Sequence, residues 1–422
     1  MKSVREGYKM TELGEIPKEW EVLKLSEIAE INPRREVLDD SSIVSFIAME
    51  DITNSGRVSK KTDKLYEEVK KGYTPFKDND VLLAKITPCF ENGKRALVEN
   101  LSNGIGFGST EFHVLRANKY SISRFLYYVI SSHRFVSKAE NNMTGSAGQK
   151  RVSTEFIKDY VVEVPTIEEQ EKIALILSTV DEQIDNVDAL IEKNKELKKG
   201  LMQTLLTKGI GHTKFKKTEI GEIPERWEIK KVGDICEVKG GKRLPKGYQL
   251  EDEDNAFPYI RVADMYMGGI KQDDIKYVPE DIVDKIKNYK ISKDDLFISV
   301  AGTLGIVGQV PDELDGANLT ENADKLCNIQ VNKLYLMKVL QSNIIQSIIE
   351  AEQTKSAQPK LALTRIKEFL IPIPSNREQE KIASILLEID KKIDEYKNKK
   401  QKLEELKKGL MQQLLTGKVR II

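Results

Sequence analysis

The stretch TELGEIPKEWEVLKLSEIAEI, which starts at Thr11, returns as TEIGEIPERWEIKKVGDICEV from Thr218. Two further segments are copied in the same order: EQEKIA from Glu169 and Glu378, and ELKKGLMQ from Glu196 and Glu405. The copies lie 207 residues apart at the start of the unit and 209 residues apart at its end. One structural unit therefore occurs twice in tandem.

The interiors of the two copies, roughly residues 35–145 and 240–350, differ almost completely. For example, STEFHVLRA (from Ser109) has no counterpart in sequence in ENADKLCNI (from Glu321). A constant frame around variable interiors predicts a protein that presents two different recognition surfaces on one repeated scaffold.

Composition narrows the class of protein. The chain has 422 residues, of which 40% are hydrophobic, and this suits two or three globular domains with cores. It has no run of about 18 apolar residues, and its first residues lack the apolar core of a signal peptide, so we expect a cytoplasmic protein without membrane spans. Lys plus Arg equals Asp plus Glu at 67 each, so any binding of nucleic acid must depend on local basic patches or on basic partners.

The three cysteines are odd in number, far apart, and not at matching positions of the two copies. This argues against a disulfide framework or a repeated metal cluster. We therefore expect Cys89, Cys236 and Cys327 to be small core residues.

Each copy ends in a long predicted helix, the first from Thr166 to Gly209 and the second from Ser375 to Gly417. Thr166 and Ser375 are the expected N-caps, a glutamate three residues later in each helix would complete a capping box, and the glycines would end the helices. A helix of about 39 residues would be about 58 Å long.

Apolar residues alternate at spacings of four and three along both helices, which is the pattern of a heptad seam. The seam consists of Ile173, Leu177, Val180, Ile184, Val187 and Ile191 in the first helix, and of Ile382, Leu386, Ile389, Ile393, Tyr396 and Leu403 in the second. Asn194 and Lys400 interrupt it, and such polar residues tend to fix the register of a helix pair.

Charge favours antiparallel pairing of these helices. Residues 168–192 are mostly acidic and residues 397–408 are mostly lysine, so antiparallel pairing brings opposite charges together, whereas parallel pairing sets like charges side by side. The alternative is that each helix packs only on its own domain. Four apolar residues lie off the seam: Leu175, Ile176, Leu190 and Leu387. Packing on the neighbouring domain or docking of a partner protein would cover them.

The interiors have the pattern of mixed α/β domains. DVLLAKI from Asp80 and DLFISVAG from Asp295 are short apolar strands at comparable places in the two copies. Another half-buried strand is expected in Glu111–Leu115, where apolar and polar residues alternate. Shorter helices are expected at Ser123–Ser132 and Leu334–Ala351.

Catalytic motifs are missing from the sequence. We find no phosphate-binding GxxxxGK[ST] loop, no HExxH or CxxC motif, and no Asn-Pro-Pro-aromatic motif of an amino-methyltransferase. His113, His133 and His212 are isolated from one another, and His113 is expected to be an ordinary surface or core histidine. These observations predict a non-catalytic chain.

The loops of the interiors carry side chains of the types that bind DNA phosphates and bases. The candidates are Lys85, Thr87, Lys94, Arg95, Ser109, Thr110 and Arg116 in the first copy, and Lys242, Arg243, Arg261, Thr303, Asn318, Asn322 and Lys325 in the second. For each of them alone, a solvated surface side chain is the competing interpretation. The junctions SAGQKRVS and SAQPKLAL add Gln149, Lys150, Arg151, Gln358 and Lys360, beside the start of each long helix, where a duplex lying along the scaffold would pass.

In combination, the TxxGEIPxxW openings, the paired EQEKIA segments and the ELKKGLMQxLLT endings resemble the specificity subunits of type I restriction-modification systems, over essentially the whole chain. The resemblance implies an α+β protein with two mixed α/β target recognition domains, separated by two long helices that form an antiparallel coiled coil with pseudo-twofold symmetry. We place the recognition domains at residues 1–164 and 209–373 and the helical spacers at residues 165–208 and 374–422.

The same resemblance implies a DNA-binding subunit without catalytic activity. Such a subunit joins two modification (methyltransferase) subunits and restriction (translocase and nuclease) subunits to double-stranded DNA. S-adenosylmethionine, ATP and magnesium would belong to those partners, so no cofactor is expected on this chain. Because the interiors differ, the DNA target should be asymmetric and in two parts, with unread bases between them. The alternative is an orphan coiled-coil DNA-binding adaptor without restriction activity.

Overall fold

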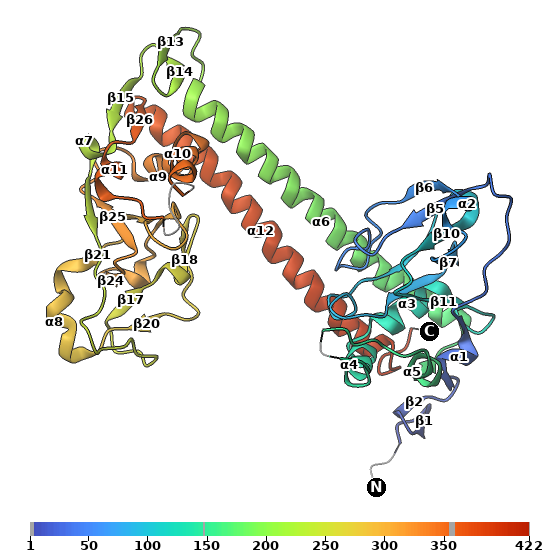
Figure 1. The fold of residues 1–422 in the computed structure, drawn as a ribbon. Coiled ribbons are helices and arrows are strands. Elements are labelled where there is room, and N and C mark those ends of the chain that lie inside the picture. Colours follow the sequence, from blue (N-terminus) through green and yellow to red (C-terminus); the bar gives the residue numbers. More distant parts are fainter. Residues whose placement is uncertain (1–3, 147, 354–358, 422) are drawn as a thin grey trace. The chain divides into compact units, whose positions relative to one another are not determined.

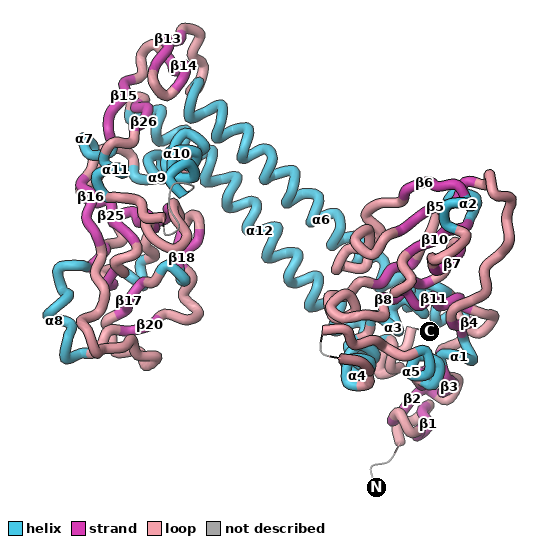
Figure 2. The backbone as a smooth tube through the Cα atoms, in the orientation of Figure 1, coloured by secondary structure: helices cyan, strands magenta, loops and turns pink. Residues whose placement is uncertain are grey.

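The computed structural model describes residues 4–146, 148–353 and 359–421, and the chain forms two compact units. Unit 1 comprises Met1–Asp188 and Asn398–Ile422, and unit 2 comprises Ala189–Lys397. Two long helices, α6 (Ile167–Lys208) and α12 (Asn376–Leu414), each contribute one part to each unit (Figure 1). The rest of each unit mixes short strands, short helices and loops (Figure 2).

Each unit contains a central sheet of four antiparallel strands. In unit 1 its strands, in order across the sheet, are β4 (Ala29–Ile31), β11 (Phe112–Ala117), β8 (Val81–Ala84) and β9 (Arg95–Leu97). In unit 2 they are β16 (Glu237–Gly240), β25 (Ala323–Cys327), β22 (Leu296–Ser299) and β23 (Val307–Gln309). The order and the pairing directions are the same in both units.

Each unit also contains an outer sheet with one parallel pair of strands. In unit 1 the order is β6 (Thr62–Leu65), β5 (Ile43–Ile47), β10 (Ile105–Gly108) and β7 (Thr74–Lys77). In unit 2 it is β20 (Lys276–Tyr277), β17 (Pro258–Ile260), β24 (Ala317–Leu319) and β21 (Lys290–Ile291). The parallel pairs are β5 with β10 and β17 with β24, so the outer sheets are equivalent too.

The two interiors therefore share one topology although their sequences do not match. The stretches STEFHVLRA and ENADKLCNI, which have no common sequence pattern, form the equivalent strands β11 and β25. Alternate side chains of the central strands face opposite layers, as a strand buried on both faces requires. Val81 and Leu83 join the core beside the helices, whereas Leu82 joins the core under the outer sheet.

Helices cover the other face of each central sheet. They are α3 (Ser123–Ser131) and α4 (His133–Asn141) in unit 1, and α9 (Lys333–Leu340) and α10 (Asn343–Gln353) in unit 2. The single helix expected at Leu334–Ala351 is wrong, because the chain breaks after α9. Ser342 Oγ donates to the Val339 carbonyl oxygen at this break, and Ser132 Oγ donates in the same way to Val129 between α3 and α4.

The copied edges of the sequence form a matching frame. Each copy begins with a hairpin, β1 (Tyr8–Thr11) with β2 (Gly14–Pro17), and β13 (Phe215–Thr218) with β14 (Gly221–Pro224). The next strand pairs with the strand that leads into the long helix: β3 (Glu21–Lys24) with β12 (Val161–Val164), and β15 (Glu228–Lys231) with β26 (Leu370–Ile373). The remaining α-helices and strands of the described residues are α1 (Leu25–Ile28), α2 (Tyr66–Val69), α5 (Thr154–Asp159), α7 (Val232–Ile235), α8 (Val283–Ile286), α11 (Leu363–Lys367), β18 (Met265–Tyr266) and β19 (Gly269–Ile270).

A buried tryptophan binds the first turn of each long helix. Trp20 Nε1 donates to Glu169 Oε2 at 2.8 Å, and Trp227 Nε1 donates to Glu378 Oε2 at 3.1 Å. Thr166 Oγ1 accepts from the Glu169 N–H at 3.3 Å, which confirms this N-cap. The expected capping boxes are wrong in their second half, because both glutamates bind tryptophan rather than the N-cap backbone.

The end of the other long helix supplies a further partner for each of these glutamates. In unit 1 Arg420 donates to Glu169 at 3.3 Å, and in unit 2 His212 Nε2 lies 2.9 Å from Glu378 Oε1. Each follows by three residues a glycine in the left-handed region, Gly417 (φ 63°) or Gly209 (φ 64°).

These two glycines are also required by close packing. A Cβ on Gly417 would lie 2.4 Å from Pro17 Cδ, and one on Gly209 would lie 2.6 Å from Trp227 Cζ2. The helix end predicted at Gly209 is confirmed, because α6 ends at Lys208, whereas α12 ends at Leu414, three residues before Gly417. Both glycines let the chain pass over the tryptophan.

The neighbouring glutamine of each EQEKIA segment fastens the helix to the loop before the short helices. Gln170 Oε1 accepts from the Ile122 N–H at 3.0 Å, and Gln379 Oε1 accepts from the Asn332 N–H at 2.9 Å. Both glutamines are buried. Thus the copied dipeptide Glu-Gln has two distinct structural roles at the start of each helix.

Ion pairs show that α6 and α12 run antiparallel within each unit. Unit 1 contains Lys407–Asp181 (2.6 Å) and Lys400–Asp188 (2.7 Å), and unit 2 contains Lys198–Asp390 (2.5 Å). The two residue numbers of each pair add to the same value, 588, as one antiparallel register requires. The predicted antiparallel pairing is confirmed, and Lys400, expected as a polar interruption of the seam, is one of the residues that fix the register.

The seam residues face inward, as predicted. Ile173, Leu177, Val180, Val187, Ile191, Ile382, Leu386 and Ile393 are buried, and Ile184, Ile389, Tyr396 and Leu403 are partly buried. The start of each seam also packs into the core of its own domain. Among the off-seam residues, Ile176 and Leu387 pack on these cores, whereas Leu175 and Leu190 are 66% and 37% exposed.

A third side chain joins the helix pair to the short helices in each unit. The Tyr128 hydroxyl donates to Asp181 at 2.7 Å, and the buried Lys338 forms an ion pair with Asp390. Burial lowers the pKa of Lys338 and raises the pKa of Tyr128. A carboxylate on a long helix therefore receives donors from two other helices in both units.

The cysteines are free thiols, with Cys236 and Cys327 buried and Cys89 partly buried. None of the helices in the described part of the chain is long and apolar enough to cross a membrane.

Replacing Trp20 by phenylalanine should cost unit 1 about 1.5–3 kcal/mol of unfolding free energy. The change keeps most of the apolar side chain but removes the donor to the buried Glu169 carboxylate. A hydrogen bond to a charged group contributes about 1.5–3 kcal/mol to stability. Urea unfolding followed by circular dichroism measures the loss, while Trp227, then the only tryptophan, reports unit 2 by fluorescence. Glu168→Gln, at the exposed neighbouring position, is the control and should change stability by less than about 0.5 kcal/mol. Equal losses in both variants would contradict this role of the Trp20–Glu169 bond.

Candidate nucleic-acid interface

In unit 1 three segments meet at the end of the central sheet where β8 ends and β11 begins. Residue 86 pairs with residue 151 in an isolated bridge, and the Val152 N–H donates to the Lys85 carbonyl oxygen at 3.0 Å. Lys85 Nζ donates to the Thr110 carbonyl oxygen at 2.9 Å. This brings together six predicted DNA-binding residues: Lys85, Ser109, Thr110, Gln149, Lys150 and Arg151.

An ion pair with two hydrogen bonds lies in this cluster. Arg151 Nε donates to Glu111 Oε2 at 3.0 Å, and Arg151 Nη2 donates to Glu111 Oε1 at 2.8 Å. The two side chains are 45% and 30% exposed. The hydrogen bonds from Arg151 lower the pKa of Glu111 and those to Glu111 raise the pKa of Arg151, so both groups are charged at neutral pH. Burial lowers the pKa of the nearby Lys85.

Unit 2 assembles the corresponding end of its central sheet in the same way. Residue 301 pairs with residue 360 in an isolated bridge, and the Leu361 N–H donates to the Val300 carbonyl oxygen at 2.9 Å. The Val300 N–H in turn donates to the Asn322 carbonyl oxygen at 2.7 Å. Thr303 lies on the exposed loop after Val300.

The loop that follows β16 adds two basic residues to this end of unit 2. The Lys242 N–H donates to the Leu319 carbonyl oxygen at 2.8 Å, and Arg243 Nε donates to Glu321 Oε1 at 2.8 Å. Five predicted residues thus gather here: Lys242, Arg243, Thr303, Asn322 and Lys360. Gln358, the remaining residue predicted at this junction, lies outside the described residues.

The two clusters differ in chemistry although they occupy equivalent places. In unit 1 the Arg151–Glu111 ion pair lies beside Lys85. In unit 2 the cluster contains the exposed Lys242 and Lys360, together with Arg243, which donates one hydrogen bond to Glu321. Sequence reasoning missed Glu111 and Glu321, because it searched for donors and not for the carboxylates that orient them. Their position just before β11 and β25 was the available signal.

Equivalent positions of the two central sheets also hold different buried titratable groups. His113 of β11 and Asp324 of β25 pair with Leu83 and Ile298, at matching places in the sheets. His113 Nε2 lies 2.9 Å from the Val152 carbonyl oxygen, which fits the tautomer with hydrogen on Nε2. Burial lowers the pKa of His113 to about 4 and raises the pKa of Asp324 to about 6. His113 is thus a core histidine, one of the two environments expected for it.

Several predicted DNA-binding residues are instead occupied within the fold. Asn318 lies in β24, is 2% exposed and donates to the Ile286 carbonyl oxygen, so its expected place on a surface loop is wrong. The Thr87 hydroxyl oxygen is buried. Lys94 Nζ donates to the Met49 carbonyl oxygen at 2.8 Å, and Lys325 Nζ donates to that of Lys290 at 2.6 Å.

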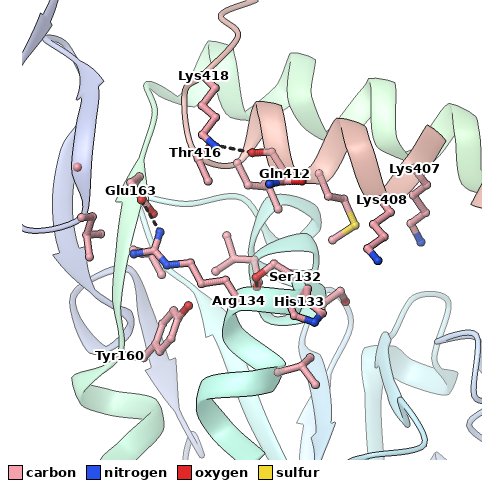
Figure 3. A pocket seen from close by; sticks show the side chains of 18 of the residues that line it. Ser132, His133, Arg134, Tyr160, Glu163, Lys407, Lys408, Gln412, Thr416 and Lys418 are labelled. Carbon is pink, nitrogen blue, oxygen red and sulfur yellow. Dashed lines mark hydrogen bonds and ion pairs between the residues drawn. The ribbon is translucent and has the colours of Figure 1, made fainter. Parts of the chain in front are cut away.

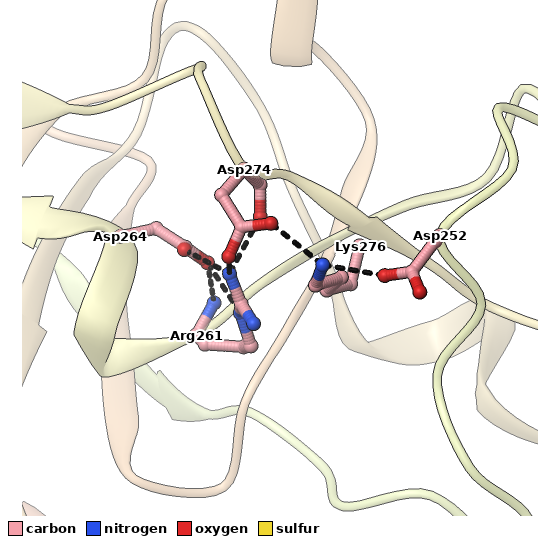
Figure 4. Close-up of polar contacts among 5 residues, drawn as sticks. All are labelled: Asp252, Arg261, Asp264, Asp274 and Lys276. Carbon is pink, nitrogen blue, oxygen red and sulfur yellow. Dashed lines mark hydrogen bonds and ion pairs between the residues drawn. The ribbon is translucent and has the colours of Figure 1, made fainter.

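Two predicted arginines each donate to one buried carboxylate, Arg116 to Asp80 and Arg261 to Asp264, and Arg261 also donates to the exposed Asp274. Arg116 donates twice to Asp80, at 2.8 and 2.7 Å, and Asp80 is 1% exposed. Arg261 donates to Asp264 and Asp274 (Figure 4). The hydrogen bond to Asp264 is the main cause that raises the pKa of Arg261. These contacts stabilise loops of their own units, and the sequence patterns did not reveal them.

Arg95 points to a different place, a cavity of about 960 Å³ between α4 and the end of α12 in unit 1. Its Nη1 donates to the Ile130 carbonyl oxygen at 2.9 Å, and burial lowers its pKa. Figure 3 shows Arg134 bound to Glu163 in this cavity, with Lys407 and Lys408 on the helix above. Arg95 therefore does not belong to the cluster at the sheet end.

Comparisons with known proteins agree with the internal repeat. A family model described as the type I restriction modification DNA specificity domain matches the chain twice, at residues 17–198 and 224–405. The type I restriction enzyme EcoAI specificity subunit of Escherichia coli is 38% identical over 50% of this chain, and the match spans only 36% of that relative's length. A putative type I restriction enzyme MjaX specificity subunit of Methanocaldococcus jannaschii is 30% identical over 99% of this chain and 97% of its own.

A solved structure has the same fold. It is the S subunit of a type I restriction-modification system from M. genitalium, which is 21% identical to this chain with a TM-score of 0.57. The superposition covers 94% of this chain and 96% of that one.

We expect the two buried titratable groups to give the units opposite pH dependence. His113 takes up a proton near pH 6.5 in the unfolded chain but only near pH 4 in the folded chain. The unfolding free energy of unit 1 should therefore fall by about 3 kcal/mol as the pH falls through this window. Asp324 keeps its proton up to about pH 6 in the folded chain but releases it near pH 3.8 in the unfolded chain. The unfolding free energy of unit 2 should therefore fall by about 3 kcal/mol as the pH rises through that window.

Unfolding in urea between pH 4 and 7 tests this, with fluorescence of Trp20 reporting unit 1 in Trp227→Phe protein and fluorescence of Trp227 reporting unit 2 in Trp20→Phe protein. His113→Asn should flatten only the unit 1 profile and Asp324→Asn only the unit 2 profile. The same slope in both units, unaffected by these substitutions, would contradict the assignment.

Proposed function

This chain belongs to the family of type I restriction-modification DNA specificity domains, and we propose that it reads a two-part, asymmetric double-stranded DNA target without being catalytic itself. The observation that carries the proposal is the pair of equivalent clusters at the ends of the central sheets. Both clusters join basic and hydrogen-bonding side chains on loops held by the same scaffold. Basic side chains suit phosphates, and fixed donors suit base edges.

The asymmetry of the target follows from the different side chains of the two clusters. A fixed Arg151–Glu111 pair in unit 1 and the cluster of Lys242, Arg243 and Lys360 in unit 2 offer different patterns of donors and charge. One base sequence does not satisfy both patterns, so the two parts of the target should differ.

The partners in this proposal are two modification (methyltransferase) subunits and the restriction (translocase and nuclease) subunits. S-adenosylmethionine, ATP and magnesium are assigned to those partners, and the complex is placed in the cytoplasm, where genomic DNA is accessible. Support comes from relatives that are named as specificity subunits of type I restriction enzymes. The names of these relatives do not favour an orphan DNA-binding adaptor.

Co-expression with a modification subunit followed by sequencing of adenine methylation tests the proposal. A methylated motif with two specified parts and unspecified bases between them is the expected result. A complex that forms without such a mark, and a chain that does not bind DNA with or without the partner, would refute it.

The antiparallel helices suit a role as a spacer that sets the distance between the two parts of the target. In the register of the three ion pairs, residues 189–195 of α6 lie opposite residues 393–399 of α12. Each segment is one heptad, so removing both preserves the seam and the ion pairs.

Deleting residues 189–195 and 393–399 together should shorten the unread spacer by roughly three base pairs. Seven helical residues correspond to about 10 Å and one base pair to about 3.4 Å. Methylation sequencing of cells that carry the double deletion and the modification subunit measures the spacer. Deleting residues 189–195 alone is the control, because it moves Lys198 out of register with Asp390 and should prevent assembly. An unchanged spacer in a folded double-deletion variant would contradict the role of the helices.

A further inference from the structure

We propose that Arg151 reads a guanine in the part of the DNA target bound by unit 1, and that Glu111 orients it for this contact. The inference rests on the proposed function and identifies one base and one pair of residues within it. It starts from the geometry of the Arg151–Glu111 pair.

A guanidinium group has five N–H donors in a planar fork and two edges that can each bind a pair of acceptors. Glu111 occupies the edge formed by Nε and Nη2, at 3.0 and 2.8 Å. Nη1 donates to the Gln149 carbonyl oxygen at 3.3 Å, which accounts for one of its two hydrogens. One hydrogen on Nη1 and one on Nη2 are left for a second pair of acceptors.

The fork is also fixed in direction. Glu111 directly precedes β11, and its carbonyl oxygen accepts from the Lys85 N–H at 2.7 Å. Arg151 forms backbone bridges with residues 86 and 144. Both residues thus lie on hydrogen-bonded backbone, and the Arg151 side chain is 45% exposed to solvent.

The pairing favours a base edge over a phosphate as the second acceptor pair. The negative charge of Glu111 offsets the positive charge of Arg151, and this weakens the attraction of Arg151 to a phosphate. The directions of the remaining N–H donors of Arg151 are unchanged. The O6 and N7 atoms of guanine accept from an arginine fork in the major groove. Lys150, exposed on the neighbouring position, supplies a positive charge for the backbone.

Three other arginine–carboxylate pairs have different geometry. The carboxylates that hold Arg116 and Arg134 are buried, at 1% and 7% exposure, so these pairs fasten loops to the core. Arg243 is exposed, but its contact with Glu321 involves Nε alone, and this leaves its fork free to rotate. The Arg151–Glu111 pair combines a guanidinium held by two hydrogen bonds with a side chain that is almost half exposed.

The test uses the complex with the modification subunit, because that is the form proposed to read DNA. The methylated motif is determined first for the unaltered complex and then for Arg151→Ala, Arg151→Lys and Glu111→Gln. Binding is measured by competition with duplexes in which each guanine of the motif is replaced in turn. Thermal unfolding shows that each variant is folded.

Arg151→Ala and Arg151→Lys should relax the requirement for guanine at one position of one part, with a loss of discrimination of about 5- to 100-fold, and leave the other part unchanged. Glu111→Gln should keep the preference for guanine but weaken it. Lys150→Ala, the matched control on the neighbouring residue, should weaken binding to all duplexes alike and reduce the salt slope by about one.

Three outcomes would overturn the inference: a motif without guanine in the part affected by Arg151, unchanged discrimination in both Arg151 variants, or an equal loss of binding to all duplexes. The last result would identify Arg151 as a phosphate contact. If the unaltered complex reads no two-part motif at all, the proposed function fails instead, so the two failures are distinguishable.

Discussion

The structure depends on one contact that occurs twice, an indole N–H that donates to a glutamate in the first turn of a long helix. The glutamate is buried in unit 1 and partly buried in unit 2. The tryptophan comes from the opening segment of a copy and the glutamate from its EQEKIA segment. A side chain beyond the end of the other long helix completes the contact, Arg420 in unit 1 and His212 in unit 2. Because a carboxylate that is largely removed from water needs hydrogen-bond donors, three distant segments of sequence are held at one point in each unit. This explains why the edges of the repeat match.

The interiors are free to differ because their topology requires much less of the sequence. A central strand buried on both faces needs apolar side chains and suitable turns, and β11 and β25 meet this requirement with unrelated sequences. Even a buried position can change its chemistry, as His113 and Asp324 show at matching places in the sheets. The loops that follow carry still fewer constraints, so the scaffold can present different donors and charges at the same sheet end.

Sequence patterns predicted the elements well and the polar contacts poorly. The heptad seam and the distribution of acidic and basic residues led to the antiparallel pair, since both are properties of a regular helix. The capping boxes failed because Glu169 and Glu378 have two competing partners, and burial beside tryptophan favours the distant one. Likewise, the sequence does not distinguish Arg116 from Arg151. Arg116 pairs with the buried Asp80, whereas Arg151 pairs with the partly exposed Glu111.

The sequence by itself determined the repeat, the two long helices, their seam and direction, and the family. These features are encoded in local periodicity, in motif spacing and in the sign of charge along a helix. Only the tertiary structure decided which cations remain exposed, which strands of the unlike interiors are equivalent, and which residues set the helix register. Those features depend on partners tens to hundreds of residues away, such as Asp188 and Lys400 or Glu111 and Arg151, and packing of the whole unit selects among such partners.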